Sequence, residues 1–212
     1  MGKKIGILLV LAGIVVAGFL FLNHYRQPNV EAENVSAISI RSEMMKAVPD
    51  LNKVSANFSE EYSDYQGLVE ESDIVIRANV KKLKNIETIE EALGGTYAFV
   101  DLEVNDVLKG DVKGKKFEIV LPDMFFYADQ SLKDLVVGKE YVFFLYKSTS
   151  NIGKLKNTYA LVSFSQGLFK KDEEQKEDEV FQRVLFDEHV KFSDLKAKVK
   201  AAVKAEESKQ NK

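Results

Sequence analysis

Residues 96–108 form a long run in which the side chains alternate in character. Small and branched apolar side chains fall on one face of an extended strand: Ala98, Val100, Leu102 and Val104. Aromatic and acidic side chains fall on the other: Tyr97, Phe99, Asp101 and Glu103. A helical period would scatter both groups around the element, whereas a period of two separates them. The run therefore predicts a strand with one face in a core.

Further strand patterns follow, separated by turn signals such as Gly94-Gly95 and Gly138-Lys139. They cover residues 73–81, 116–121, 140–146, 159–164, 168–169 and 180–186. Residues 140–146 are apolar on both sides, which favours a central strand. Five or more short strands with peripheral helices predict a mainly β fold, a small OB-like β-barrel. A seven-stranded sandwich is the alternative.

Residues 5–22 contain no charged side chain and are mostly apolar. As a helix this run is about 27 Å long, close to the hydrocarbon thickness of a bilayer. Lys3 and Lys4 precede it, so the positive-inside rule places the N-terminus in the cytoplasm and the rest of this single-pass chain outside. The alternative is a cleaved signal peptide and a secreted protein. The run is longer than an ordinary signal core, and a cleavage pattern comes only near Ala32.

These features divide the chain into four parts. Residues 1–22 are the expected signal-anchor or transmembrane helix, and residues 23–56 are a connector in which Pro28 breaks any continuing helix. Residues 57–192 are the expected extracytoplasmic β-barrel domain. Residues 193–212 are a C-terminal helix and tail, with helical spacing from residue 195 to about residue 207. Two more short helices are expected within residues 36–47 and 59–71.

Composition excludes several classes of function. The chain has no cysteine and two histidines, His24 and His189, so thiol nucleophiles, disulfides and cysteine zinc sites are excluded. Beyond residue 26 the chain carries 27 basic and 33 acidic side chains, a balance that does not attract nucleic acid. We therefore expect no cofactor, no metal and no nucleic-acid partner.

The sequence contains no motif that assembles a catalytic centre. His189 stands alone, without a nucleophile elbow elsewhere. Asp101 and Glu103 share a strand face about 6.8 Å apart, a spacing from which a carboxylate-dependent cell-wall hydrolase remains an alternative. Nothing in the sequence encloses this pair, so we expect a protein that is not an enzyme.

The segment that invites a binding role follows the strand at 116–121. Met124, Phe125, Phe126 and Tyr127 are four consecutive large side chains, and clustered aromatics are favoured at protein contacts. We expect them to be a partner contact, with the alternative that they cover the open end of the barrel. Tyr97 and Phe99 would extend this patch or lie under the C-terminal helix.

Several stretches together resemble small, uncharacterised exported or membrane-anchored proteins of Gram-positive bacteria. These are Ser72-Asp-Ile-Val-Ile76, residues 97–107 followed by Leu108-Lys-Gly-Asp111, residues 138–145, Tyr159-Ala-Leu-Val162 and Gln166-Gly-Leu-Phe169. They also resemble, distantly, OB-like barrels of the netrin and metalloproteinase-inhibitor (TIMP) type. The resemblance implies a fold for about residues 60–170. It supplies no active-site residue, and the inhibitor mechanism needs an N-terminal cysteine that this chain lacks.

Taken together, the sequence predicts an extracytoplasmic binding or accessory module of unknown ligand. Residues 5–22 would hold it in the membrane, and its partner would be a protein, a peptide or a cell-wall component. An immunity protein at the cell surface is an alternative, because a small anchored ectodomain suits that role as well.

Overall fold

The computed structural model describes residues 38–48, 64–92, 94–126, 135–163, 166–175, 179–184 and 188–210. The chain divides into two units, Met1–Ser36 and Ala37–Lys212, and every described residue belongs to the second. The expected anchor at residues 5–22 and most of the connector at 23–56 lie outside the described residues. Within the described ranges, no helix combines the length and apolar character that a membrane span requires.

The described residues form a mainly β domain, as the alternating patterns predict. The strands are β1 (Ile74–Ile89), β2 (Gly95–Lys109), β3 (Lys116–Pro122), β4 (Glu140–Lys147), β5 (Tyr159–Leu161), β6 (Leu168–Lys171), β7 (Val180–Arg183) and β8 (His189–Lys191). The α-helices are α2 (Ile40–Ala47), α3 (Tyr65–Glu70) and α4 (Phe192–Gln210). Short 3₁₀ turns are η2 (Glu90–Ala92), η3 (Asp123–Phe126) and η4 (Gly153–Leu155).

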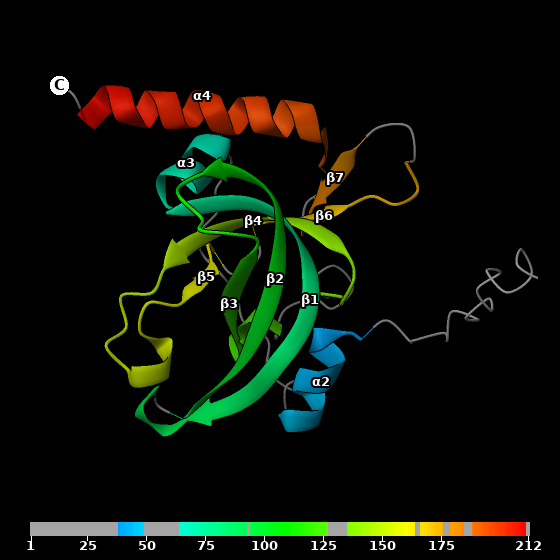
Figure 1. Cartoon of the computed structure of the whole chain (residues 1–212), viewed down its shortest axis with the longest axis vertical. Helices are drawn as coiled ribbons and strands as arrows, with labels where there is room; N and C mark the ends of the chain where they lie inside the picture. The colour runs from blue at the N-terminus through cyan, green and yellow to red at the C-terminus, as the bar shows by residue number, and fades with distance from the viewer. Residues whose placement is uncertain are drawn as a thin grey trace, which may run out of the picture. The chain divides into compact units, whose positions relative to one another are not determined.

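All eight strands belong to one antiparallel sheet, in the order β3-β2-β1-β4-β6-β7-β8, with β5 paired to β4. A single sheet excludes the two-sheet sandwich. β1 and β2 are long and strongly curved (Figure 1), and their ladder shifts register at four places, which is how bulges bend a strand pair. The curvature brings β3 round toward β5, where the rings of Phe117 and Tyr159 lie 4.9 Å apart between centroids. Among the described residues no hydrogen-bonded ladder joins β3 to β5, so the sheet is not closed.

β4 separates two apolar cores. Its Tyr141, Phe143 and Leu145 point into the first core, which fills the inside of the curved sheet. Its Val142 and Phe144 point into the second, which lies between the sheet and the helices α3 and α4. The strand is apolar on both sides because each side faces a different core, which confirms the predicted central strand.

Helix α4 lies beside α3 across one end of the curved sheet and covers part of its outer face (Figure 1). Leu195, Val199 and Ala202 lie on one stripe and are buried in the second core, as their spacing predicts. Two ion pairs attach the helix to β2, from Lys196 to Asp106 at 2.6 Å and from Lys109 to Glu206 at 2.7 Å. α4 begins earlier than expected, because Phe192 already packs into the same core.

A single arginine connects the strands beneath the start of α4. Arg77 of β1 donates two hydrogen bonds to Glu140 of β4, at 2.8 and 2.9 Å, and two to Glu179, which directly precedes β7. Its guanidinium also lies over the rings of Phe192 and Phe181, 4.5 and 5.6 Å from their centroids. We call this group the Arg77 clamp. It holds β1, β4, β7 and α4 in one arrangement.

Substitution of Gly110, directly after β2, tests how closely the backbone there packs against the carbonyl group of Asp73. Gly110 has a φ of +82°, and a Cβ there would lie 2.5 Å from the carbonyl oxygen of Asp73. Gly114 has a φ of +81° but open space around it. We expect Gly110→Ala to lower the free energy of unfolding by roughly 3 kcal/mol and Gly114→Ala by about 1 kcal/mol, in urea titrations. Equal losses would contradict the close approach.

The Arg77 clamp predicts a specific dependence of stability on pH. Burial alone would raise the pKa of Glu140, but hydrogen bonds from Arg77, Lys171 and Asn105 outweigh it and lower that pKa to about 2. Because the folded pKa lies below the unfolded one, this stabilisation is complete above about pH 4.5 and is lost as the pH falls toward 2. Glu140→Gln should therefore flatten the fall in unfolding free energy over this range, by on the order of 2 kcal/mol.

Urea titrations between pH 2 and pH 7 measure this difference. The matched control is Glu173→Gln, because Glu173 makes an exposed ion pair with Lys139 and its side chain is more than half exposed. The control variant should keep the pH dependence of the parent chain. A Glu140→Gln profile parallel to the parent's would show that the clamp does not titrate as described.

Candidate functional site

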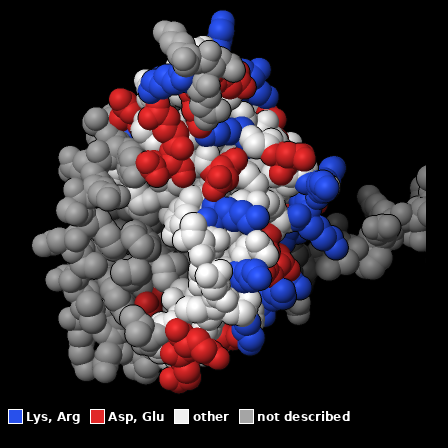
Figure 2. Space-filling model, turned by 90° about the vertical axis from the view of Figure 1, so that its left-hand side faces the viewer, with Lys and Arg blue, Asp and Glu red and all other residues white. Residues whose placement is uncertain are grey.

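On the described part of the face in Figure 2, charged side chains of both signs are interspersed, with uncharged side chains between them. One hollow of about 370 Å³ lies over strands β1, β2 and β3. Three lysines and three acids surround two apolar residues there, Leu102 and Phe117. We call it the charged hollow. Its lining includes Asp101 and Glu103, the two carboxylates considered above as a hydrolytic pair.

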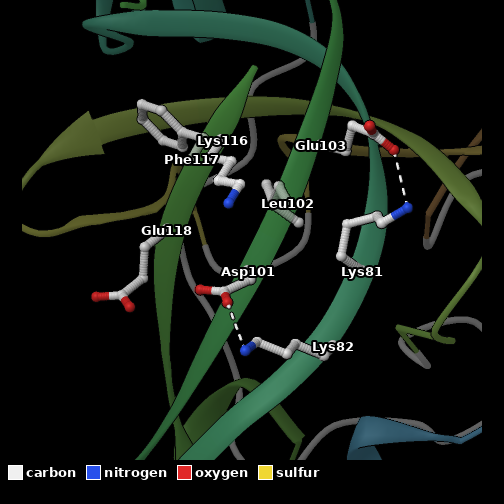
Figure 3. A pocket seen from close by; sticks show the side chains of 8 residues that line it. All are labelled: Lys81, Lys82, Asp101, Leu102, Glu103, Lys116, Phe117 and Glu118. Carbon is white, nitrogen blue, oxygen red and sulfur yellow. Dashed lines mark hydrogen bonds and ion pairs between the residues drawn. The ribbon is translucent and has the colours of Figure 1, made fainter. Parts of the chain in front are cut away.

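Lysines from β1 neutralise these carboxylates. Figure 3 shows Lys81 reaching Glu103 and Lys82 reaching Asp101, at 2.9 and 3.4 Å. The hydrogen bond from Lys81 lowers the pKa of Glu103 below its ordinary value. A general acid of a glycosidase needs the opposite shift, toward neutrality. The geometry favours a solvated ladder of ion pairs over a hydrolytic centre.

The segment Met124–Tyr127 was predicted to be an exposed partner contact, but two of its aromatic side chains are buried. Residues 123–126 form the 3₁₀ turn η3, which carries Phe125 and Phe126 into the first core, where both are fully buried and meet edge to face. Neither ring is at the surface of the described domain, so neither is exposed as a partner contact would be. The side chain of Met124 and all of Tyr127 lie outside the described residues.

A second hollow, of about 430 Å³, lies where β2, β3, β4 and β5 come together on the outer side of the sheet. Tyr97 of β2 and Tyr146 of β4 line it, together with Val120 and Pro122 of β3. The segment 148–158, which joins β4 to β5, forms one wall. We call this hollow the tyrosine groove. Tyr146 is 38% exposed, one of the most exposed large hydrophobic residues in the described ranges.

The wall of the tyrosine groove is held in shape by hydrogen bonds within its own segment. Ser148 Oγ accepts from the amide of Ser150, and Ser150 Oγ accepts from the amide of Ile152, both at 3.1 Å. Thr158 donates its hydroxyl to the carbonyl of Leu155, and the amide of Ser148 donates to the carbonyl of Thr158, both at 2.8 Å. The three hydroxyl groups that line the groove are thereby fixed in position.

Beneath this wall lies a small apolar cluster, and it accounts for the burial of Phe99 on the outer face of β2. Phe99, Val120 and Leu155 are buried together with Ile89, and Tyr97 and Ile152 pack against them. Tyr97 and Phe99 therefore lie under the segment 148–158. They do not lie under α4, which was one of the two placements expected from the sequence.

Both tyrosines of the groove have raised pKa values, and Tyr97 contributes to the shift of Tyr146. Burial raises the pKa of Tyr146, and the phenol of Tyr97 raises it further. Burial also raises the pKa of Tyr97, with a smaller contribution from the carboxylate of Asp123. The residues come from strands far apart in the sequence, which is why sequence reasoning missed the pair. The available signal was Tyr146 at the end of an apolar strand, followed by Ser148 and Ser150.

A neighbouring hollow of about 520 Å³ extends the tyrosine groove along the β1–β2 connection. The two share Glu91 and Ile152 in their linings. Lys154 lines the extension, and its ammonium is paired with Glu87. Among the described residues that line the groove itself, Glu91 is charged and no lysine or arginine is present.

The described part of the chain contains no group of three or more His, Asp and Glu side chains placed to hold a metal ion. His189 lies 3.4 Å from Asp172, in an ion-pair arrangement at the end of the sheet. His24 lies outside the described residues. No protein-family model matches this chain, and no curated protein is significantly similar to it in sequence.

The coupling of the two phenols predicts a measurable shift. Tyr97→Phe should lower the pKa of Tyr146 toward 10 without reaching it, because burial, the larger cause, remains. Titration of ¹³Cζ-labelled tyrosine by NMR measures this value. Tyr65→Phe is the control, because Tyr65 packs in the second core and should leave the pKa of Tyr146 unchanged. A pKa of Tyr146 that does not respond to Tyr97→Phe would contradict the proximity of the two rings.

Proposed function

We propose that this protein is a membrane-anchored binding module that holds an extended, uncharged ligand in the tyrosine groove, outside the cytoplasm, without chemical turnover. The observation that carries the proposal is the groove itself. Two tyrosines, fixed hydroxyls and an apolar floor meet in one hollow that continues into a second. Binding pockets in proteins commonly combine apolar and aromatic walls with a few placed polar groups.

The order of the strands supports the tyrosine groove as the place where a ligand binds. Five strands follow each other around the first core in the order β3-β2-β1-β4-β5, and the contact between Phe117 and Tyr159 bridges the first and the last. We infer from this order a partly open barrel of the OB type. Such domains bind polymers on the face of their second and third strands, between the loops that follow the first and fourth. The tyrosine groove lies against β2 and β3, between the β1–β2 connection and the segment 148–158.

The placement at the membrane rests on the sequence. Residues 5–22 provide an uncharged segment of spanning length, and Lys3 and Lys4 favour a cytoplasmic N-terminus. The described domain then faces the exterior, in keeping with the resemblance to exported proteins of Gram-positive bacteria. Protease added to intact cells should degrade the domain, and its full protection would overturn this placement.

The absence of turnover in the proposal follows from the chemistry of the lining. The described residues of the groove contribute phenols, hydroxyls and the carboxylate of Glu91, and the paired acids of the charged hollow are neutralised by lysines. Phenols with a raised pKa are weak bases and weak acids at neutral pH. This lining suits contact and orientation more than proton transfer.

Site-specific photocrosslinking in intact cells tests the groove. A p-benzoylphenylalanine placed at position 146 should form a defined adduct with the ligand. The same group at position 81, in the charged hollow, should not. Ala160→Trp, introduced on the floor of the groove, should remove the adduct while the circular dichroism spectrum stays unchanged. The residue at position 160 lines the groove from β5, so a large side chain there occupies the ligand's space.

Two results would overturn the proposal. The first is the absence of any adduct at position 146. The second is an identical set of adducts at positions 146 and 81, because the two positions lie in different hollows.

A further inference from the structure

The chemistry of the tyrosine groove also indicates what kind of polymer fills it. Tyr146 is 38% exposed, and Tyr97, which is close enough to raise the pKa of Tyr146, lines the same hollow. An aromatic ring offers a flat apolar face and, in tyrosine, a polar edge. The matching ligand unit is itself a ring with an apolar C–H face and polar groups around its rim. A pyranose sugar has this shape.

The serine hydroxyls provide the polar part of the match. Ser148 and Ser150 already accept a backbone hydrogen each, so their oxygens are fixed while their own hydrogens remain to be donated. These hydrogens suit the ring and hydroxyl oxygens of a sugar. The carboxylate of Glu91 adds an acceptor for sugar hydroxyl groups. Donors and acceptors therefore border an aromatic surface.

The charge of the described lining of the groove disfavours a polyanion. The described lining contains Glu91 and neither lysine nor arginine, and Asp123 lies close enough to raise the pKa of Tyr97. Lys154 in the extension is already paired with Glu87. Polyanions such as nucleic acid depend on unpaired cations for their affinity. The binding of an uncharged chain does not depend on unpaired cations.

The strand arrangement disfavours an extended peptide. A peptide that joined the sheet between β3 and β5 would have to hydrogen-bond to both edges, which then stand about 10 Å apart. The rings of Phe117 and Tyr159 already meet across this gap, 4.9 Å apart. A peptide strand would have to separate them and open the first core, against which both rings pack. A sugar chain lying on the outer surface requires no such opening.

From these four observations we propose that the tyrosine groove binds an uncharged sugar chain of several pyranose units, stacked on Tyr146 and Tyr97. The continuation of the groove past Glu91 and Ile152 provides room for more than one unit. This inference rests on the proposed function and adds the chemical class of the ligand.

Titration of the full-length chain with defined polymers tests the inference, in a detergent without a sugar headgroup. The probes are the hexamer of N-acetylglucosamine, cellohexaose, a hexadeoxythymidylate and an uncharged hexapeptide. At least one of the two sugar chains should bind saturably, and the nucleotide and the peptide should not. Tyr146→Ser should weaken that binding by roughly tenfold, whereas Tyr146→Phe, which keeps the ring, should stay within about threefold.

Glu118→Gln, in the charged hollow, is the matched control and should bind as the parent chain does. Failure of both sugar chains to bind, or equal binding by the parent and Tyr146→Ser, would overturn the inference. If the photocrosslinked adduct at position 146 is a peptide, the sugar assignment is wrong while the binding module stands. Absence of any adduct at that position overturns the proposed function and this inference together.

Discussion

The Arg77 clamp is the interaction on which the outer layer of the domain depends. Its guanidinium binds two carboxylates and lies over two aromatic rings, so one side chain joins elements from distant parts of the sequence. Glu140 is only 11% exposed, and a carboxylate in such a place is costly unless it is paired. Because the guanidinium also lies over Phe192, the clamp fixes the position at which α4 begins. The second core closes when that helix lies in place.

Much of the fold could be predicted because the strands alternate. In β2 the period of two separates the first-core residues of 98–104 from those on the other face. β4 was recognisable by a different pattern, a run of residues that is apolar on both sides. The second half of β1 was missed because Lys81, Lys82 and Lys84 interrupt the apolar pattern where the strand bends into solvent. β8 was missed because three residues with one buried side chain, Val190, carry too little pattern.

The candidate site was harder to predict, for a physical reason. Consecutive aromatics at 124–127 resemble an exposed patch, yet the 3₁₀ turn η3 directs Phe125 and Phe126 inward. Whether a loop aromatic faces solvent depends on the direction of the preceding strand and on the room in the core, which local sequence does not encode. Tyr97 and Tyr146 each look like ordinary strand residues. They reach one hollow only because the curved sheet brings β3, which pairs with β2 at Tyr97, round to β5, which pairs with β4 at Tyr146.

The segment 148–158 is held by hydrogen bonds of Ser148, Ser150 and Thr158 within itself and by the burial of Leu155 against the sheet. Because these contacts fix its shape in advance, the proposed ligand would not have to order a loop on binding, and less of the contact energy would be lost as entropy. The ladder between β4 and β5 joins residues 145–147 to residues 159–161 and leaves Ser150 outside it. Side chains at such positions shape the groove without taking part in the pairing that fixes the strands.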